Sequence, residues 1–330
     1  MRITKPSYFD SFQCLAGICP DSCCKEWDVQ VDDTSAALYR SLPGPLGDRL
    51  RQVMYTEDSE VYMAIENRRC PMWREDGLCR IQAELGHDAL CKTCREFPRL
   101  THDYGNFVEK GLELSCPEAA RLILKAEDLP NTTEEVPGGE LPEYDEEAMK
   151  NLLRSRKVAL SILRQENLPP NEALAQLLYY GYQAQAELDG EPESDFFPAD
   201  LKALELPQAD YADFLSFFRT LEILTPQWQS RLDSPDAHPQ WQNGFRNLAR
   251  YFVERYWLQA VSDYDLVCRV KLAVISCLAV FTLGGDLTET AQLYSKEIEN
   301  SADNVDALLD AAYTHPAFTD RNLLALLLNT

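Results

Sequence analysis

The cysteines of this chain are concentrated in its first third. Nine of the eleven precede residue 117, and four of these form the compact motif Cys14-x4-Cys19-x3-Cys23-Cys24. The first ten residues, MRITKPSYFD, lack the apolar core of a secretion signal, so we expect a cytoplasmic protein, in which thiols stay reduced. A dense set of thiols in a reducing compartment indicates metal ligation.

Thiolates bind zinc ions and iron–sulfur clusters because both are thiophilic. The pair Cys91-x2-Cys94 has zinc-type spacing but no second pair to complete the site. Cys19-x3-Cys23 opens like the radical-SAM signature, which fails here because its third cysteine would fall at Glu26. Dispersed cysteines can still converge on one centre in the fold. The candidate ligands are Cys14, Cys19, Cys23, Cys24, Cys70, Cys79, Cys94 and Cys116.

Three cysteines stand apart from this set. Cys268 and Cys277 lie in an apolar segment and are expected to be ordinary buried thiols. Cys91 is set aside as well. Basic residues surround the candidate ligands and could offset the negative charge of a thiolate-bound cluster. They are Arg68, Arg69, Arg74, Arg80, Lys92, Arg95 and Arg99.

Charge and hydropathy exclude several classes of protein. The net charge is −23, with most of the acidic excess after residue 125, which disfavours binding to nucleic acid because a phosphate backbone needs Lys and Arg. The longest apolar run, Leu266–Leu283, contains Arg269 and Lys271 and is shorter than the ~20 residues of a span. It therefore predicts a buried helix and no membrane insertion. No P-loop or glycine-rich dinucleotide fingerprint occurs.

We expect a mainly α protein with two domains. Residues 1–125 predict a small cysteine-rich domain of mixed α/β structure that binds the metal or cluster. Residues 126–143 are acidic and contain prolines and a glycine pair, which indicates a linker. Residues 144–330 predict an all-α helical domain, with proline and glycine breaks between its helices.

Local patterns predict the individual elements. Strands are expected at residues 27–31, 61–65, 99–103 and 107–114. Short helices are expected at 33–39, 46–54, 80–85 and 87–94, and one more begins with Ser115 as its cap. Apolar stripes in the second domain predict helices at 149–162, 174–182, 215–224, 245–261, 265–283, 287–298, 305–313 and 318–328.

Four segments of residues 5–125 occur in a fixed order. They are Lys5-Pro6-Ser7-Tyr8 followed by Phe12-x-Cys14-x4-Cys19-x-Asp21-Ser22-Cys23-Cys24; Cys70-Pro71-Met72-x4-Gly77-Leu78-Cys79; Thr93-Cys94-Arg95-x-Phe97-Pro98-Arg99; and Leu114-Ser115-Cys116-Pro117-Glu118. Together these segments resemble the flagellin lysine-N-methylases. Parts of them also resemble a broader group of zinc- or iron-chelating proteins. Cys91 departs from the pattern of the methylases.

The resemblance implies methyl transfer from S-adenosylmethionine to lysine side chains of flagellin, with a [4Fe–4S] cluster. An open iron could chelate the methionine moiety and so replace a nucleotide-binding fold. The acceptor lysine must lose its proton before it can attack, because its ammonium has a pKa of about 10.4. Asp21, Glu96, Tyr104 and Glu113 lie near the cysteines in sequence and could orient or deprotonate it.

Two other functions stay open at this point. A cysteine-rich zinc-binding module could carry a helical protein-interaction domain, in which case zinc would be found without iron or labile sulfide. An iron–sulfur protein could instead serve in redox chemistry or sensing without methyl transfer. A methylation assay with flagellin separates this last function from the methylase.

Overall fold

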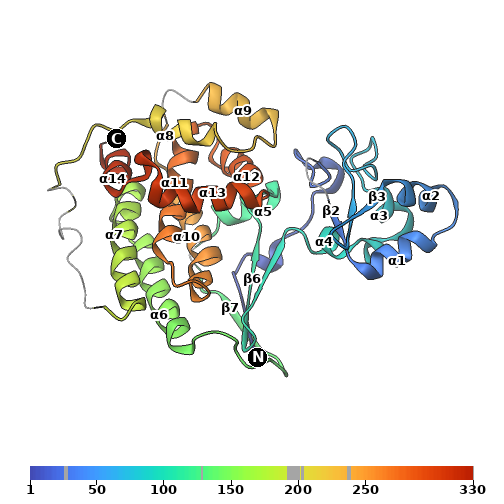
Figure 1. Ribbon diagram of the computed structural model, residues 1–330, viewed down its shortest axis with the longest axis horizontal. Coiled ribbons are helices and arrows are strands. Elements are labelled where there is room, and N and C mark those ends of the chain that lie inside the picture. Colours follow the sequence, from blue (N-terminus) through green and yellow to red (C-terminus); the bar gives the residue numbers. More distant parts are fainter. Residues whose placement is uncertain (26–28, 128, 192–200, 202–203, 236–238, 330) are drawn as a thin grey trace.

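The structure, a computed structural model, describes residues 1–25, 29–127, 129–191, 201, 204–235 and 239–329 (Figure 1). Its buried hydrophobic residues form two separate cores. The smaller core lies within residues 29–91, in what we call the small lobe, and the larger core lies in a helical lobe. The prediction of a mainly α protein is confirmed. In Figure 1 the small lobe stands to the right of the helical lobe, with strand β6 between them.

The small lobe contains a three-stranded antiparallel sheet. Its central strand β4 (Glu60–Met63) lies between β2 (Val29–Val31) and β3 (Met54–Glu57). In β2 the two valines are buried and the glutamine between them is exposed, which is the two-residue period of a strand with one covered face. The helices of this part of the chain are α1 (Asp33–Ser41), α2 (Gly44–Val53), α3 (Arg80–Leu85) and α4 (Lys92–Glu96).

One carboxylate ties the first and last of these helices together. The side chain of Asp32 caps α1 by accepting from the Ser35 N–H at 3.0 Å, and it also accepts from the Lys92 N–H at 2.8 Å. Such a cap stabilises a helix by about 1 kcal/mol. Because Lys92 opens α4, the same interaction fixes the position of the Cys91–Cys94 segment.

A second sheet joins the ends of the cysteine-rich region. Strand β1 (Arg2–Lys5) pairs in parallel with β6 (Phe107–Leu112) and antiparallel with β7 (Thr132–Glu135), while β5 (Arg99–Asp103) forms a hairpin with β6. Strand β7 lies inside the segment predicted as a linker. Helix α5 (Pro117–Leu124) and residues 107–114 pack into the core of the helical lobe. The larger core therefore draws residues from both sides of the acidic segment 126–143.

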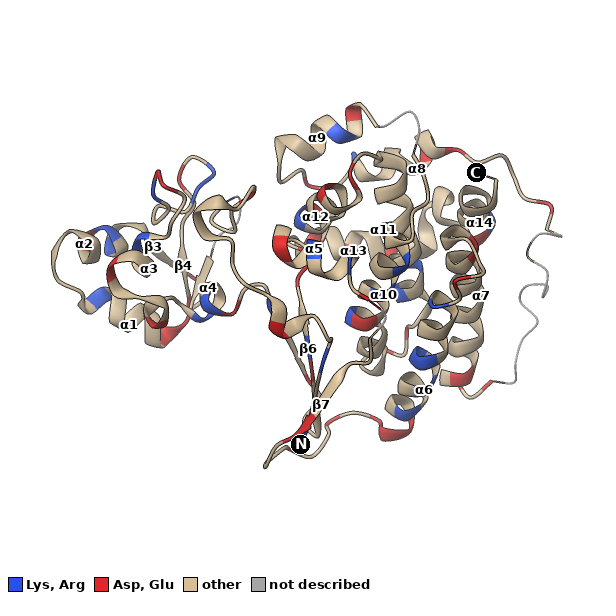
Figure 2. Ribbon diagram, turned by 180° about the vertical axis from the view of Figure 1, so that it is seen from behind, with Lys and Arg blue, Asp and Glu red and all other residues tan. Residues whose placement is uncertain are grey.

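The described residues after 144 are helical, as predicted. The helices are α6 (Glu146–Leu163), α7 (Pro170–Leu188), α8 (Tyr211–Phe218), α9 (Pro226–Asp233), α10 (Gly244–Tyr256), α11 (Val267–Leu283), α12 (Leu287–Ile298), α13 (Ala302–Thr314) and α14 (Asp320–Leu328). Figure 2 shows Lys and Arg interspersed with Asp and Glu along the helices of both lobes.

Helix α11 runs through the centre of the helical lobe, and all of its residues are buried. Its two charged residues have partners. The Lys271 ammonium donates to the Ala312 carbonyl at 2.9 Å and pairs with Asp320, while Arg269 pairs with Asp263 at 2.8 Å. The apolar run is thus a buried helix, as predicted. Among the described residues, no helix combines the length and apolarity needed to cross a membrane.

The structure corrects several local predictions. The helix expected at 87–94 is broken, because Leu90 and Cys91 are extended between a 3-10 turn and α4. The cap of α5 is Cys116 and not Ser115. Helix α9 was not predicted at all, since its apolar stripe is short. Residue 27, at the start of the first predicted strand, lies outside the described residues.

Candidate functional site

Seven of the eight candidate ligands line one cavity of about 430 Å³. Its walls come from residues 12–25, the loop that ends at Cys79, α4, the start of α5 and the end of α12. Both lobes therefore contribute. The seven cysteines are Cys14, Cys19, Cys23, Cys24, Cys79, Cys94 and Cys116. The eighth candidate, Cys70, is buried in the small-lobe core.

Two glycines allow the loops that carry these thiols to approach one another. A Cβ atom on Gly17 would lie 2.8 Å from the Asp76 carbonyl oxygen, and one on Gly77 would lie 3.1 Å from the Cα of Gly17. Gly77 also has a φ of +79°, a conformation that glycine adopts without strain. The Asp76-Gly77 turn can thus pack against the short 3-10 turn that separates Cys14 from Cys19.

Several of the thiols contact one another. The Cys24 thiol is hydrogen-bonded to the thiols of Cys23 and Cys70, which lowers its pKa and raises the pKa of both partners. In the same way, the contact between Cys91 and Cys94 lowers the pKa of Cys91 and raises that of Cys94. The contacts therefore favour the thiolate form of Cys24 and of Cys91. The thiolate is the form of cysteine that binds metals.

Cys91, which the sequence reasoning set aside, thus lies against a candidate ligand. It is the N-cap residue of α4, and Cys94 follows one turn later. Cys116 occupies the same position at the start of α5. Burial raises the pKa of Cys116 to about 11, although the backbone N–H groups of Ala119 and Glu118 partly offset this effect. Backbone N–H groups at a helix start favour negative charge, so ligation at these positions is supported electrostatically.

Within the described residues, no three His, Cys, Asp or Glu side chains form a group that could hold a metal ion as it stands. The thiols surround the cavity without a preformed shell of ligands. Their chemistry still fits a thiophilic centre. The buried hydroxyl of Ser115 also lines the cavity and has no hydrogen-bond partner in the described part of the chain. A buried polar group of this kind is normally satisfied, which suits a site that receives a ligand.

Asp21 fixes the cysteine-rich loop to the helical lobe. Its carboxylate pairs with the ammonium of Lys296 at 2.8 Å and accepts from the amide of Gln292 at 3.1 Å, both on α12, while Lys25 lies 3.3 Å away. Arg68 supplies a second contact by donating to the Leu224 carbonyl at 2.5 Å. Asp21 thus serves as an ion-pair partner in this structure. No sequence signal could reveal Lys296, since it lies 275 residues away.

We expect Asp21→Asn to loosen the contact between the lobes by roughly 1–3 kcal/mol, because Lys296 would lose its charged partner in a largely buried position. Hydrogen exchange should become faster in residues 14–25 and in α12 but not in α7. The matched control is Asp48→Asn, which breaks an exposed pair with Arg51. Unchanged exchange in Asp21→Asn would show that this ion pair does not hold the lobes together.

The same contact should depend on pH. Burial pushes the pKa of Asp21 upward, but Lys296 and Lys25 outweigh it and hold the pKa below its ordinary value of 3.8. Since the folded-state pKa is the lower one, the ion pair contributes fully above about pH 4 and is lost as the pH falls through the folded-state value. Exchange in residues 14–25 should therefore stay slow at pH 5–7.

The charged residues of the cavity are mostly basic. Asp21 and Glu118 are its acids among the described lining residues, and Glu118 is held by Arg121 at 2.6 Å. Of the seven basic residues expected around the ligands, only Arg95 and Arg99 are among these lining residues. Lys25 and Lys296 complete the basic set.

The other three residues considered for the acceptor lysine are not among the described residues of this cavity. Glu96 is exposed at the end of α4. Tyr104 stacks on Phe107 with ring centroids 4.8 Å apart. Glu113 pairs with Arg255 at 3.6 Å, and burial raises its pKa.

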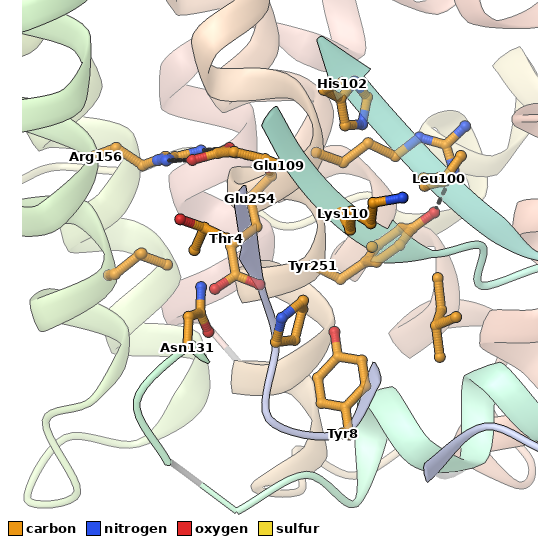
Figure 3. Close-up of a pocket in the computed structure, with 15 residues that line it drawn as sticks. Thr4, Tyr8, Leu100, His102, Glu109, Lys110, Asn131, Arg156, Tyr251 and Glu254 are labelled. Atoms are coloured by element: carbon orange, nitrogen blue, oxygen red, sulfur yellow. Dashed lines mark hydrogen bonds and ion pairs between the residues drawn. The ribbon is translucent and has the colours of Figure 1, made fainter. Parts of the chain in front are cut away.

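A second, smaller cavity of about 70 Å³ lies in the helical lobe beside the four-stranded sheet. Figure 3 shows Arg156 and Glu109 side by side at its edge, with Tyr251 and Glu254 also lining it. Arg156 binds Glu109 through two hydrogen bonds of 2.5 and 2.7 Å. This cavity is far smaller than a cofactor site, which usually exceeds 300 Å³. The buried ion pair joins β6 to α6, so we assign it a structural role.

Comparison with known proteins gives three relatives. The flagellar biosynthetic protein FliU of Salmonella muenchen is 33% identical over 135 residues, which cover 39% of this chain and 80% of FliU. The lysine-N-methylases of Salmonella typhimurium and Salmonella choleraesuis show the same identity over 135 residues. The match spans only 34% of the length of each lysine-N-methylase. No protein-family model and no solved structure matches the chain.

Proposed function

The chain belongs to the family of the flagellar biosynthetic protein FliU, and we propose that it is a lysine N-methyltransferase that modifies flagellin. The methyl donor would be S-adenosylmethionine, and cysteines of the cavity would bind a [4Fe–4S] cluster. The convergence of seven thiols on one cavity is the observation that carries this proposal. The cavity volume of about 430 Å³ also lies in the usual range for sites of small molecules, about 300–1,000 Å³.

The cavity offers groups for both the cluster and the methyl donor. The cluster ligands would come from the seven cysteines of the cavity, with Cys70 beside them in the small-lobe core. When bound, the cluster would provide an iron with an open position for the amino and carboxylate groups of the methyl donor. Arg95 and Arg99 would add positive charge for that carboxylate. The Ser115 hydroxyl, which has no partner among the described residues, would supply a hydrogen bond.

The acceptor lysine needs to enter as a neutral amine. Neither acid of the cavity is suited to remove its proton, because ion pairs hold the pKa of Asp21 and that of Glu118 below their ordinary values. The basic side chains Lys25, Arg95 and Arg99 would instead repel an ammonium. Like charges nearby disfavour the charged form, so they would lower the pKa of the incoming lysine.

A methyl-transfer assay tests this function. Protein purified and kept under anaerobic conditions would be incubated with S-adenosylmethionine and flagellin, and the lysines of flagellin would be examined by mass spectrometry. We expect methyl groups on lysine side chains, and none on flagellin whose lysines have been acetylated beforehand. If iron-loaded protein leaves flagellin unmodified, the proposed function is wrong.

A further inference from the structure

The nine cysteines of the first 116 residues fall into two groups, according to whether or not they belong to the small-lobe core or pack against it. Five belong to the small-lobe core or pack directly against it, and we call them the inner group. They are Cys24, Cys70, Cys79, Cys91 and Cys94. The other four form the outer group. They are Cys14, Cys19, Cys23 and Cys116, and all four line the cavity, as do Cys24, Cys79 and Cys94 of the inner group.

The inner group is held together by short contacts. The Cys70 N–H donates to the Cys24 carbonyl at 2.8 Å, which places the two residues on neighbouring backbone segments. Their thiols are hydrogen-bonded, as are those of Cys91 and Cys94. Two contacting pairs of thiols therefore lie in one small core. Cys70 and Cys91 are buried, with 7% and 2% of their surfaces exposed.

The outer group is more open, and its members come from residues 14–23 and from the N-cap of α5. Cys14 and Cys23 are exposed to solvent, and Cys19 is partly exposed. Cys116 is contributed by the helical lobe, where it belongs to the large core. The adjacent residues Cys23 and Cys24 thus belong to different groups. Neighbouring side chains in an irregular segment can serve two different sites, and this pair connects them.

The size of the small-lobe core gives a physical reason for a second metal. Only 14 buried residues form this core, two of them cysteines. In a domain of fewer than about 70–80 residues a single hydrophobic core rarely supplies more than about 3–5 kcal/mol, and natural domains of that size often add a structural metal. Structural zinc sites are closed by four protein ligands, whereas reactive metal sites keep a position open.

We propose that the chain holds two metal centres, a structural zinc ion bound by four thiolates of the inner group and the iron–sulfur cluster bound by the outer group. The cluster part rests on the proposed function, whereas the zinc part does not. Zinc binding would draw the two contacting thiol pairs together and release their protons. Cys91, which the sequence analysis set aside, belongs to the group that would bind the zinc ion. The two metals considered for this protein are then both present, at different thiols.

The test is metal analysis of three alanine variants of the full chain, purified under anaerobic conditions from medium that contains iron and zinc. Cys14→Ala removes an exposed thiol of the outer group, so little packing is lost. It should lose at least half of the iron and labile sulfide, keep about one zinc per chain, and resist proteolysis like the wild type. Cys70→Ala should lose the zinc and become sensitive to protease within residues 29–96. The control Cys268→Ala should keep both metals.

Because Cys70→Ala also removes a buried side chain from the small-lobe core, a second measurement uses wild-type protein. Oxidation and chelation should strip its iron but leave its zinc and its protease resistance. Zinc replaced by cobalt should give the absorption of a tetrahedral cobalt–thiolate site. Wild-type protein without zinc, or loss of zinc together with iron in Cys14→Ala, would overturn the proposal. Zinc that persists in a protein without methyl transfer would overturn only the proposed function.

Discussion

Alanine in place of Cys116 is expected to lower methyl transfer to flagellin by roughly 100-fold or more while the helical lobe stays folded. Cys116 lines the cavity and is the thiol that the helical lobe contributes to the outer group. Its loss would remove a cluster ligand and the link between the cluster and α5. The loss of packing is small, about 1 kcal/mol for one sulfur atom. The rate is measured by mass spectrometry of flagellin, alongside the iron content.

The matched control for this variant is Cys277→Ala. Cys277 is fully buried in α11 and lies outside both groups of thiols. It was predicted to be an ordinary buried thiol, and burial raises its pKa. Methyl transfer and iron content should therefore match the wild type. Equal activity in Cys116→Ala and Cys277→Ala would show that Cys116 is not a ligand.

Glu109→Gln is expected to destabilise the protein by about 3 kcal/mol. The change leaves the Arg156 guanidinium without its charged partner, and only 12% of the Arg156 side chain is exposed. Removing one partner of a buried pair costs about 3–5 kcal/mol, and we expect the low end because the pair borders a cavity (Figure 3). The thermal midpoint should fall by roughly 5 °C or more in calorimetry.

A comparable ion pair on the surface provides the control for this variant. Arg154 and Glu187 join α6 to α7 at 3.0 Å, but 59% of the arginine and 35% of the glutamate are exposed. Exposed pairs contribute about 0–1 kcal/mol, so Glu187→Gln should barely shift the midpoint. Similar midpoints for Glu109→Gln and Glu187→Gln would contradict the structural role of the buried pair.

Much of the fold could be predicted from local patterns. The helix predicted at 287–298 and the strand predicted at 99–103 correspond to α12 and β5 at the same bounds. The apolar run with two charges was correctly read as a buried helix, because its lysine and arginine find carbonyl and carboxylate partners. Such features depend on residues that are close in the sequence, so the periodicity of apolar residues predicts them.

The remaining features depend on contacts between distant residues. Strand β7 forms in an acidic segment because β1, 130 residues earlier, offers it a partner. Lys296 enters the cavity from α12 without any motif to mark it. Cys91 was set aside on its sequence context, yet its thiol contacts Cys94. The grouping of the cysteines likewise follows from which of them pack against the small-lobe core, and spacing along the chain does not contain that information.

The most direct test of the account is whether methyl transfer follows the cluster. One anaerobic preparation would be divided into a portion stripped of iron, a portion stripped and then reconstituted with iron and sulfide, and an untreated portion. We expect methyl transfer to flagellin to disappear with the iron and to return with it, in proportion to the labile sulfide measured. Iron-free protein that still transfers methyl groups at the rate of the untreated portion would contradict a cluster-based mechanism.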